Sequence, residues 1–378
     1  MDDVKRQLRL VDPLAALDVL LALLPEPVPP RRVPVAEAIG RVLAETLTAP
    51  RPVPQVPVAA WDGWPVVAAD TQGAGAYSPA PLPGSLIWVQ SGCPLPPGTD
   101  AVLPDWAVLH GPPAQATDPI TPGDGVIAPG EDVAVGSVVG QGGQRLPVNC
   151  LAALHSSGFE TVAVREPRVG FICCGDELVG HPERDGLGPF LAALLVNDGA
   201  APLARSLVPD SAAAITTALT TASTTADLVL LLGGTGAGRK DRASEGLAGA
   251  GQLLSHGLGS RPGASAGFGL VDRTPVVLIP GRWQDAYAAW LLLARPAVRR
   301  LTGMQPTDRP RARLTRKVAS AVGLADLVPV RSAGPGLVEP LAVGAAPPGV
   351  LAVANAILLV PPASEGYDIG AEVELESL

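Results

Sequence analysis

The sequence predicts a multidomain α/β protein whose largest unit has a mostly parallel sheet between helices. Three observations lead to this fold class. Strand-like and helix-like segments alternate from 168 to about 304, the stretch 51–129 is rich in proline and glycine, and short strands return over 305–378. The length of 378 residues also exceeds that of a typical single domain.

The N-terminal segment predicts a capped helix and then a mixed region. Asp12 precedes Pro13 and an apolar run to Leu24, which places Asp12 at the N-cap and proline at the first helical position. The following VAEAIGRVLAETLTAP segment predicts a short helix that passes into a strand. Beyond it, the Pro- and Gly-rich region with short apolar alternations predicts a small β domain with loops.

The alternating region predicts right-handed βαβ units. The expected strands are RVGFICC, PLARSLV, DLVLLLGG and TPVVLIPG, and the expected helices are GPFLAALLVNDGA, DSAAAITTALTTAST with Asp210 as its cap, and WQDAYAAWLLLARPAVRRL. Ligands of such sheets bind outside the carboxyl ends of the strands. Three of those ends carry the loops CCGDEL, LLGGTGAGRKD and IPGRW.

The loop LLGGTGAGRKD is the most informative local motif. Its glycines, Gly233, Gly234, Gly236 and Gly238, allow a close backbone approach and can turn N–H groups toward a phosphate. It is neither a Walker loop nor a dinucleotide-binding G-x-G-x-x-G motif. A tight turn without a ligand is the competing interpretation. Asp241 at its end would hold Mg²⁺, polarise a nucleophile or cap the following helix.

Two acids follow another strand of the same sheet. Asp176 and Glu177 stand directly after the strand that ends in Cys174. Carboxylates in that position suit Mg²⁺, which prefers one or two carboxylates together with substrate phosphates.

Composition excludes several classes of protein. The net charge of −9 argues against a nucleic-acid-coating protein. The apolar stretches fall short of the roughly 20 residues that span a bilayer, and the N-terminus lacks the plan of a secretory signal, so we expect a cytoplasmic protein. The four cysteines form no zinc or disulfide pattern and are interpreted as reduced packing residues.

Taken together, these motifs resemble the molybdopterin molybdenumtransferase family (MoeA and the E domain of gephyrin) along nearly the whole chain. The segment 60–64, AWDGW, and the A-D-T at 69–71 are similar to the family's S-A-M-D-G-Y-A and A-x-D-T, so Trp61 and Trp64 stand where the family has Met and Tyr. SGCPLPPGTDAV is similar to T-G-A-x-x-P-x-G-A-D-A-V, and the G-E-D at 130–132 and G-D-E-L at 175–178 also agree.

The resemblance implies an elongated homodimer of four-domain subunits. The implied domains are a discontinuous N-terminal domain (1–50 and 130–166), a small β domain (51–129), a MogA-like three-layer α/β domain that binds molybdopterin (167–304) and a C-terminal β domain (305–378). The implied reaction inserts molybdenum from molybdate into adenylated molybdopterin, releases AMP and uses Mg²⁺. An adenylyltransferase or a client molybdoenzyme is the implied protein partner.

The resemblance also implies the site residues. The catalytic residues would be Asp62, Glu177 and Asp241, of which Glu177 and Asp241 would bind the metal. The ligand-binding residues would be Ser91, Gly175, Asp176, Gly233, Gly234, Thr235, Gly236, Gly238, Pro262, Gly263, Pro280, Gly281 and Arg282.

The sequence departs from the family pattern in three loops. The family's G-G-V-S-V-G-D-x-D is G-G-T-G-A-G-R-K-D here, P-G-K-P is P-G-A-S with Ala264 in place of lysine, and L-P-G-N-P is I-P-G-R-W. Each hydrogen bond to a charged group contributes about 1.5–3 kcal/mol, so two losses would weaken anion binding by about a hundredfold unless Arg261, Arg282 or Lys240 compensates.

These departures keep two other functions open. One is a non-catalytic paralogue that binds molybdopterin or finished cofactor as a carrier or scaffold. The other is adenylation of the pterin, which only the G-G-T-G loop suggests. Trp61 and Trp64 would either fill the gap between domains or stack on the pterin.

Overall fold

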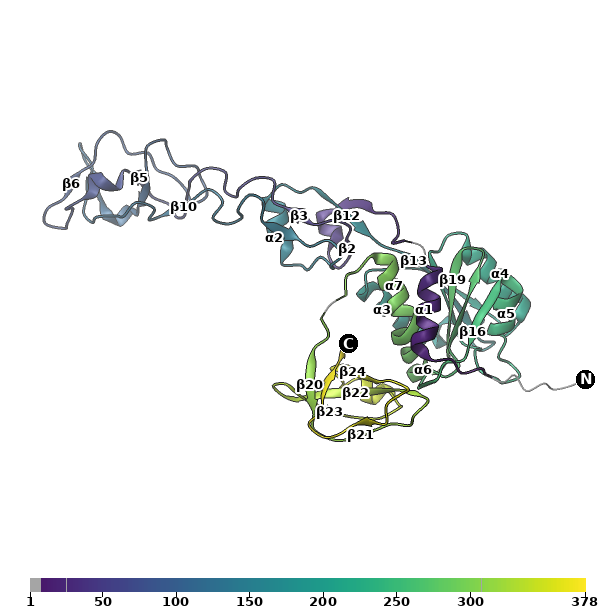
Figure 1. Ribbon diagram of the computed structural model, residues 1–378. Coiled ribbons are helices and arrows are strands. Elements are labelled where there is room, and N and C mark those ends of the chain that lie inside the picture. The colour runs from purple at the N-terminus through teal and green to yellow at the C-terminus, as the bar shows by residue number, and fades with distance from the viewer. Residues whose placement is uncertain (1–7, 25, 307) are drawn as a thin grey trace, which may run out of the picture.

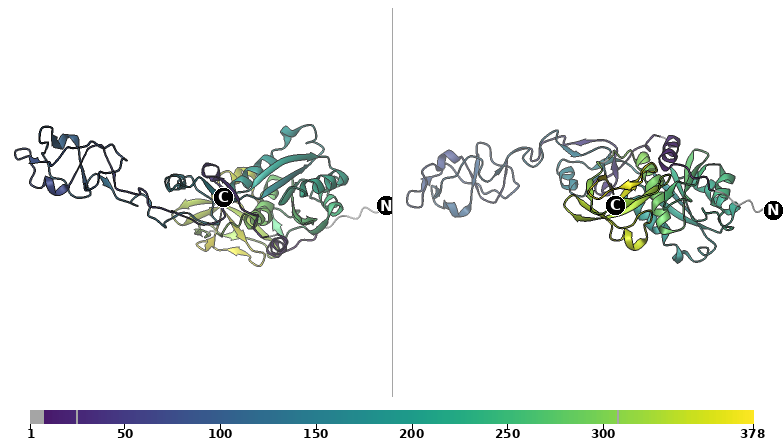
Figure 2. Two further views of the ribbon diagram at one scale, coloured as in Figure 1. Left: turned by 90° about the horizontal axis from the view of Figure 1, so that it is seen from above. Right: turned by 60° about the horizontal axis from the view of Figure 1, so that its bottom comes forward.

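The computed structural model describes residues 8–24, 26–306 and 308–378. The molecule is elongated: a small β domain projects far from a larger body that contains the α/β domain and the C-terminal β domain (Figure 1). The two views of Figure 2 show the same projection. The predicted α/β fold class is confirmed, while the predicted domain boundaries stay a prediction. No helix among the described residues is long and apolar enough to cross a membrane.

The N-terminal part contains one helix that packs away from its sequence neighbours. Helix α1 (Pro13–Leu23) starts as predicted, because an Asp12 carboxylate oxygen accepts the Leu14 N–H at 2.8 Å. Its buried Ala16 and Leu20 join the core of the α/β domain. Helix α1 is therefore part of that packing layer.

The connecting region is built from chain segments on both sides of the small β domain. Strands β1 (Arg31–Pro34), β12 (Thr161–Arg165) and β2 (Val42–Leu43) form an antiparallel sheet, and β3 (Leu47–Thr48) pairs with β11 (Val138–Gly140). The 3₁₀ helix η1 (Val35–Ala38) and helix α2 (Cys150–Ser156) complete it. The predicted helix-to-strand passage corresponds to η1, β2 and β3.

The small β domain consists of short strands and 3₁₀ turns. They are β4 (Val58–Ala59), β5 (Trp64–Val66), η2 (Ala68–Thr71), β6 (Ala80–Pro81), β7 (Ala101–Leu103), η3 (Asp105–Ala107), β8 (Val108–Leu109), β9 (Gln115–Ala116) and β10 (Val126–Ile127). Its small core is made of residues such as Val66, Leu82 and Leu103. The region has no α-helix among its described residues, as predicted.

The α/β domain has a six-stranded sheet in the order β14-β13-β15-β19-β18-β16. Its strands are β13 (Arg168–Cys174), β14 (Ala201–Val208), β15 (Leu228–Leu232), β16 (Gln252–His256), β18 (Gly267–Val271) and β19 (Thr274–Ile279). The first four in the order pair in parallel, and β18 and β16 add an antiparallel edge. The predicted mostly parallel sheet is confirmed.

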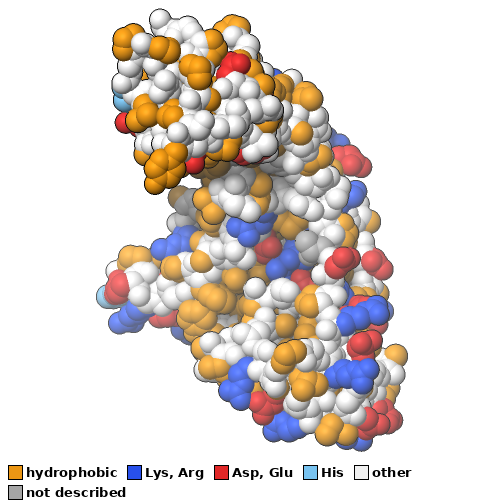
Figure 3. Space-filling model, turned by 90° about the vertical axis from the view of Figure 1, so that its left-hand side faces the viewer, with side chains coloured by type: hydrophobic (Ala, Val, Ile, Leu, Met, Phe, Trp, Pro, Cys, Tyr) orange, Lys and Arg blue, Asp and Glu red, His pale blue; other side chains and the backbone are white. Residues whose placement is uncertain are grey.

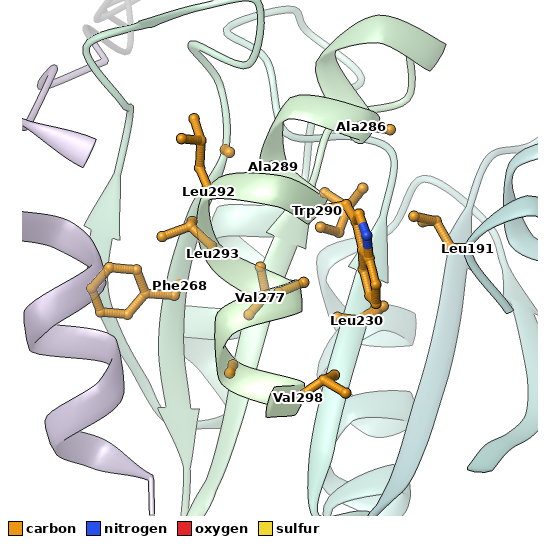
Figure 4. Packing of buried hydrophobic residues seen from close by; sticks show 14 of the residues in the cluster. Leu191, Leu230, Phe268, Val277, Ala286, Ala289, Trp290, Leu292, Leu293 and Val298 are labelled. Atoms are coloured by element: carbon orange, nitrogen blue, oxygen red, sulfur yellow. The ribbon is translucent and has the colours of Figure 1, made fainter. Parts of the chain in front are cut away.

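Helices cover both faces of this sheet. Helices α4 (Ala212–Ser223) and α5 (Ala243–Ala250) pack on one face, and α1, α3 (Leu187–Asn197), α6 (Trp283–Ala289) and α7 (Arg295–Thr302) pack on the other (Figure 1). Figure 4 shows Trp290 between Leu230 of the sheet and Leu191 of α3. The domain therefore has three layers.

Two helix predictions need correction. The N-cap of α4 is Ser211, not Asp210. The long helix that we expected after Gly281 is divided into α6 and α7 by a π turn over Trp290–Ala294. Pro296 lies in the first turn of α7 and has no N–H to donate to the preceding turn, which favours such an irregularity.

The C-terminal β domain forms a second large sheet. Its elements are β20 (Arg311–Leu314), β21 (Val318–Ala319), β22 (Ala325–Gly334), β23 (Leu337–Pro340), α8 (Pro348–Leu351), β24 (Ala356–Val360), β25 (Gly366–Tyr367), β26 (Glu372–Glu374) and β27 (Glu376–Ser377). Strand β17 (Ser260–Arg261) leaves the α/β domain and pairs in parallel with β22. Arg295 of α7 also bridges Asp198 and Glu376, at 3.1 and 3.0 Å. The two domains are thus joined by backbone and ionic contacts.

Replacement of Trp290 by alanine tests the core of the α/β domain. Trp290 is 1% exposed, and removing so large a buried side chain should cost about 3–5 kcal/mol of unfolding free energy. Urea unfolding followed by circular dichroism measures it. Trp106→Ala is the control, because Trp106 is 75% exposed and its loss should change stability by about 0.5 kcal/mol or less. Equal losses in both variants would contradict this packing.

Candidate functional site

Three loops meet at the carboxyl edge of the parallel sheet. Strands β13, β15 and β19 are neighbours, so their ends lie side by side. A Cβ atom on Gly233 would stand 2.8 Å from the Cys174 carbonyl oxygen, and one on Gly281 would stand 3.6 Å from the Gly233 Cα. Gly233 also has a φ of +83°, which favours glycine. The predicted meeting of these loops is confirmed.

The glycine loop uses some of its amides internally. Gly233 donates its N–H to the Ile279 carbonyl at 2.9 Å, and Gly238 donates to an Asp241 carboxylate oxygen at 2.6 Å. Within the described part of the chain, the amides of Gly234, Thr235 and Gly236 donate to no other residue. The loop can therefore offer this central group of amides to an anion, while its two ends hold its shape.

Asp241 does not cap the following helix. Helix α5 has Arg242 at its N-cap position, and no side chain there accepts a helix N–H. The helix-cap interpretation of Asp241 is therefore wrong. Its carboxylate turns back over the glycine loop, where a Cβ atom on Gly236 would be 2.6 Å from it.

Thr235 connects the glycine loop to two other segments. It is 2% exposed, and its hydroxyl lies 3.1 Å from the Ser265 hydroxyl. Its carbonyl oxygen lies 2.7 Å from Nε2 of His256, which donates to it. His256 could not be found from the sequence, because a single histidine on an edge strand belongs to no motif.

An acidic cluster lies beside the glycine loop. Asp176 accepts the Asp210 N–H at 3.1 Å and binds the Lys240 ammonium at 3.1 Å. Burial, followed by the charges of Asp176 and Glu177, raises the pKa of Asp210 above its ordinary value. Asp210, expected as a helix cap, is thus a member of this cluster. The Lys240 hydrogen bond lowers the pKa of Asp176.

The Pro262–Gly263 loop is held by the C-terminal domain. Arg261 donates from Nε and Nη2 to the two carboxylate oxygens of Asp326, at 2.7 and 2.6 Å. Asp326 is completely buried and also accepts the Ser320 hydroxyl at 2.7 Å. Gly263 donates its N–H to Asp285 at 2.8 Å. Arg261 is therefore committed to Asp326 and compensates poorly for the lysine that Ala264 replaces.

The third loop, Pro280 to Arg282, presents a cation to solvent. The Arg282 side chain is 81% exposed and lies 3.7 Å from the Asp285 carboxylate. Such an exposed pair contributes little to stability. Arg282 is therefore only weakly attached.

Asp62 and Ser91 lie together in the small β domain. Ser91 donates its N–H to Asp62 at 2.7 Å and its hydroxyl to the Ala60 carbonyl at 3.0 Å. This domain stands at the opposite end of the molecule from β19 and α4 (Figure 1). Asp62 and Ser91 therefore do not join the three loops within one chain, whereas Gly175, Glu177, Gly233 and Gly281 do.

The residues present do not form a complete metal site. Among residues 8–24, 26–306 and 308–378, no three His, Cys, Asp or Glu side chains are arranged to hold a metal ion. The carboxylates of Asp176, Glu177 and Asp210 nevertheless gather negative charge at the strand ends. One or two carboxylates would suffice for a Mg²⁺ ion whose other ligands come from phosphates and water.

Two families of known proteins match successive parts of this chain. Residues 11–158 match the MoeA N-terminal region (domain I and II), and residues 170–300 match the family described as a probable molybdopterin binding domain. Fold and loops together define a multidomain protein of the molybdopterin-binding class.

Individual relatives show to which family the chain belongs. Molybdopterin molybdenumtransferase 2 of Mycobacterium tuberculosis H37Rv is 30% identical over 328 residues, which cover 78% of this chain and 81% of the relative. Molybdopterin molybdenumtransferase of Haemophilus influenzae is 29% identical, with 81% and 82% covered. The crystal structure of the molybdopterin biosynthesis MoeA protein from Pyrococcus horikoshii superposes with a TM-score of 0.72 at 27% identity, covering 98% of this chain and all of that one. The chain belongs to the molybdopterin molybdenumtransferase family.

Arg261→Met tests how firmly the C-terminal domain holds the Pro262–Gly263 loop. The substitution leaves Asp326 buried without its partner, which should cost about 3–5 kcal/mol of unfolding free energy. Chemical denaturation measures the loss. Arg311→Met is the matched control: Arg311 and Glu374 are more than half exposed, so its loss should be below about 1 kcal/mol. If Arg261→Met loses no more unfolding free energy than Arg311→Met, the Arg261–Asp326 pair does not hold the loop.

Proposed function

We propose that this protein inserts molybdenum from molybdate into adenylated molybdopterin and releases AMP. The observation that carries the proposal is the meeting of the loops after β13, β15 and β19 at one sheet edge, in a chain that belongs to this family. The amides of Gly234 to Gly236 would hold the phosphate of the pterin. Arg282 would add an exposed positive charge beside them.

The reaction on the phosphate side is a hydrolysis. A water oxygen attacks the adenylyl phosphorus, the bond from that phosphorus to the pterin phosphate oxygen breaks, and AMP leaves. Asp62 would orient this water and accept its proton. The molybdopterin phosphate is regenerated without any change in oxidation state.

Glu177 and Asp241 would hold Mg²⁺ together with the substrate phosphates. The ion supplies charge neutralisation for the pyrophosphate when it is bound. Asp241 has a second task, because its carboxylate fixes Gly238 and so keeps the glycine loop in shape.

The site would be shared between two subunits. Asp62 lies in the projecting β domain, at a distance from the glycine loop of its own chain (Figure 1). A homodimer in which each projecting domain reaches the α/β domain of its partner would complete two equal sites. We propose this dimer, in the cytoplasm, with an adenylyltransferase as supplier or a molybdoenzyme as recipient.

A second function is favoured because cationic side chains near these loops already bind carboxylates of the same chain. Arg261 is bound to Asp326, Lys240 is bound to Asp176, and Ala264 stands where the family has lysine. A site with so few uncommitted cations would bind a pterin ligand without catalysing turnover. The alternative is therefore a non-catalytic carrier or scaffold for molybdopterin or its molybdenum form.

Asp62→Ala distinguishes the two functions. The wild-type protein, incubated with adenylated molybdopterin, Mg²⁺ and molybdate, should release AMP, and the variant should lose at least about a hundredfold in rate because the water loses its base. Chromatography of AMP measures the rate.

The matched control is Asp118→Ala, which removes an exposed carboxylate of the same domain and should keep the wild-type rate. Ligand retention without AMP from the wild-type protein would support the carrier. Wild-type turnover in Asp62→Ala would contradict the role of Asp62.

A further inference from the structure

Tryptophan is concentrated in the small β domain. Four of the six tryptophans of the chain lie there, namely Trp61, Trp64, Trp88 and Trp106, although aromatic residues make up only 3% of the sequence. Trp88 remains 42% exposed. Figure 3 looks onto this end of the molecule and shows hydrophobic side chains at the surface of the projecting domain. A half-exposed indole ring leaves a flat apolar surface that a planar ligand can cover.

An isolated β-bridge puts two of these rings on the face of Asp62. Gly63 and Val89 exchange both backbone hydrogen bonds, at 3.0 and 2.9 Å. Side chains alternate along paired strands, so the neighbours of this pair point to the other face. Burial agrees: Val89 is buried, whereas Asp62 and Trp88 are exposed and Trp64 is half-buried. Asp62, Trp64 and Trp88 therefore share one face, on which Trp64 packs against the core of the small β domain while Asp62 and Trp88 stay exposed.

The two rings are held in a fixed arrangement. Trp64 and Trp88 meet edge to face with centroids 5.0 Å apart and planes at 77°. The Trp64 indole N–H donates to Asp105 at 2.9 Å, and Asp105 lies 3.1 Å from Nε2 of His110. The His110 ring stands 5.3 Å from Trp64 on another edge. An exposed ring that is oriented in advance loses little entropy when a ligand stacks on it.

Trp61 has a different role. Its indole N–H donates to the Val102 carbonyl at 3.1 Å, and a Cβ atom on Gly125 would be 2.6 Å from the ring. Trp61 therefore packs on its own domain, although 42% of it stays exposed. The packing interpretation agrees with these contacts of Trp61, and it also holds for Trp64, which packs against the domain core and contacts the exposed Trp88.

We propose that Trp64 and Trp88 form a stacking platform for the planar, fused nitrogen heterocycle of the ligand, with Trp88 offering the open ring face. This proposal rests on the proposed function, because Asp62 on the same face would then act beside the ligand's phosphates. The adenylated substrate carries two such heterocycles, pterin and adenine, and both have the planar surface that an indole recognises. Trp88 would be a binding residue and would take no part in the chemical step.

Trp88→Leu and Trp88→Phe test the platform in the full-length protein. Stacking of one ring contributes enough that Trp88→Leu should weaken ligand binding by about tenfold or more, whereas Trp88→Phe keeps a flat ring and should retain most of the affinity. Trp106→Leu is the control, since Trp106 is an exposed tryptophan of the same domain. Calorimetric titrations with AMP alone and with molybdopterin alone decide which heterocycle is stacked.

Three results would overturn the platform. The first is that Trp88→Leu binds both AMP and molybdopterin with wild-type affinity. The second is that the wild-type protein binds neither compound. The third is a change in the oligomeric state of Trp88→Leu at unchanged ligand affinity, which would assign the ring to a protein contact. Melting temperatures and circular dichroism of the variants must match the wild type for the comparison.

The AMP-release assay separates this inference from the proposed function. If the wild-type protein releases AMP and Trp88→Leu keeps the wild-type KM and kcat, the platform fails and the proposed reaction stands. If ligand affinity depends on Trp88 but the wild-type protein releases no AMP, the platform stands and the reaction fails. An increase in KM at unchanged kcat supports both.

Discussion

The parallel pairing of β13, β15 and β19 is the constraint on which the rest of the site depends. It places the end of β15 close to the ends of both neighbours: a Cβ atom on Gly233 would stand 2.8 Å from the Cys174 carbonyl oxygen, and one on Gly281 would stand 3.6 Å from the Gly233 Cα. Only glycine fits at that distance with the backbone angle that Gly233 adopts. The further parallel pairing of β13 with β14 brings Asp210 beside Asp176 and Glu177. Burial, followed by the charges of these two residues, raises the pKa of Asp210. Parallel pairing thus determines both the backbone geometry and the local charge at this edge.

The C-terminal domain acts on this edge through a buried ion pair. Asp326 is withdrawn from water and binds Arg261 with two hydrogen bonds, directly before the Pro262–Gly263 loop. A buried carboxylate requires its partner, so the loop cannot shift without a large loss of free energy. Because the Arg261 guanidinium binds Asp326, it holds the loop in position. It therefore contributes little positive charge toward a ligand.

Much of this could be predicted from the sequence, and the failures have physical reasons. The strands, α1 with its Asp12 cap and the convergence of the glycine-bearing loops follow from local periodicity and from the rule for parallel sheets. The role of Asp210 could not, because its partner Asp176 is distant in sequence. The Arg261–Asp326 pair likewise depends on a tertiary contact. The π turn before α7 was missed although Pro296 marks it in the sequence. The proposed assignments of the site residues stay predictions.

The projecting β domain separates Asp62 from the three loops, and we propose that a second subunit closes this distance. Mixing two inactive variants, Asp62→Ala and Glu177→Ala, tests the shared site most directly. A mixed dimer would contain one intact pair of residues, so unfolding and refolding the variants together should restore about a quarter of the wild-type rate of AMP release if subunits combine at random. No recovery, in a mixture shown to contain mixed dimers, would contradict the shared site.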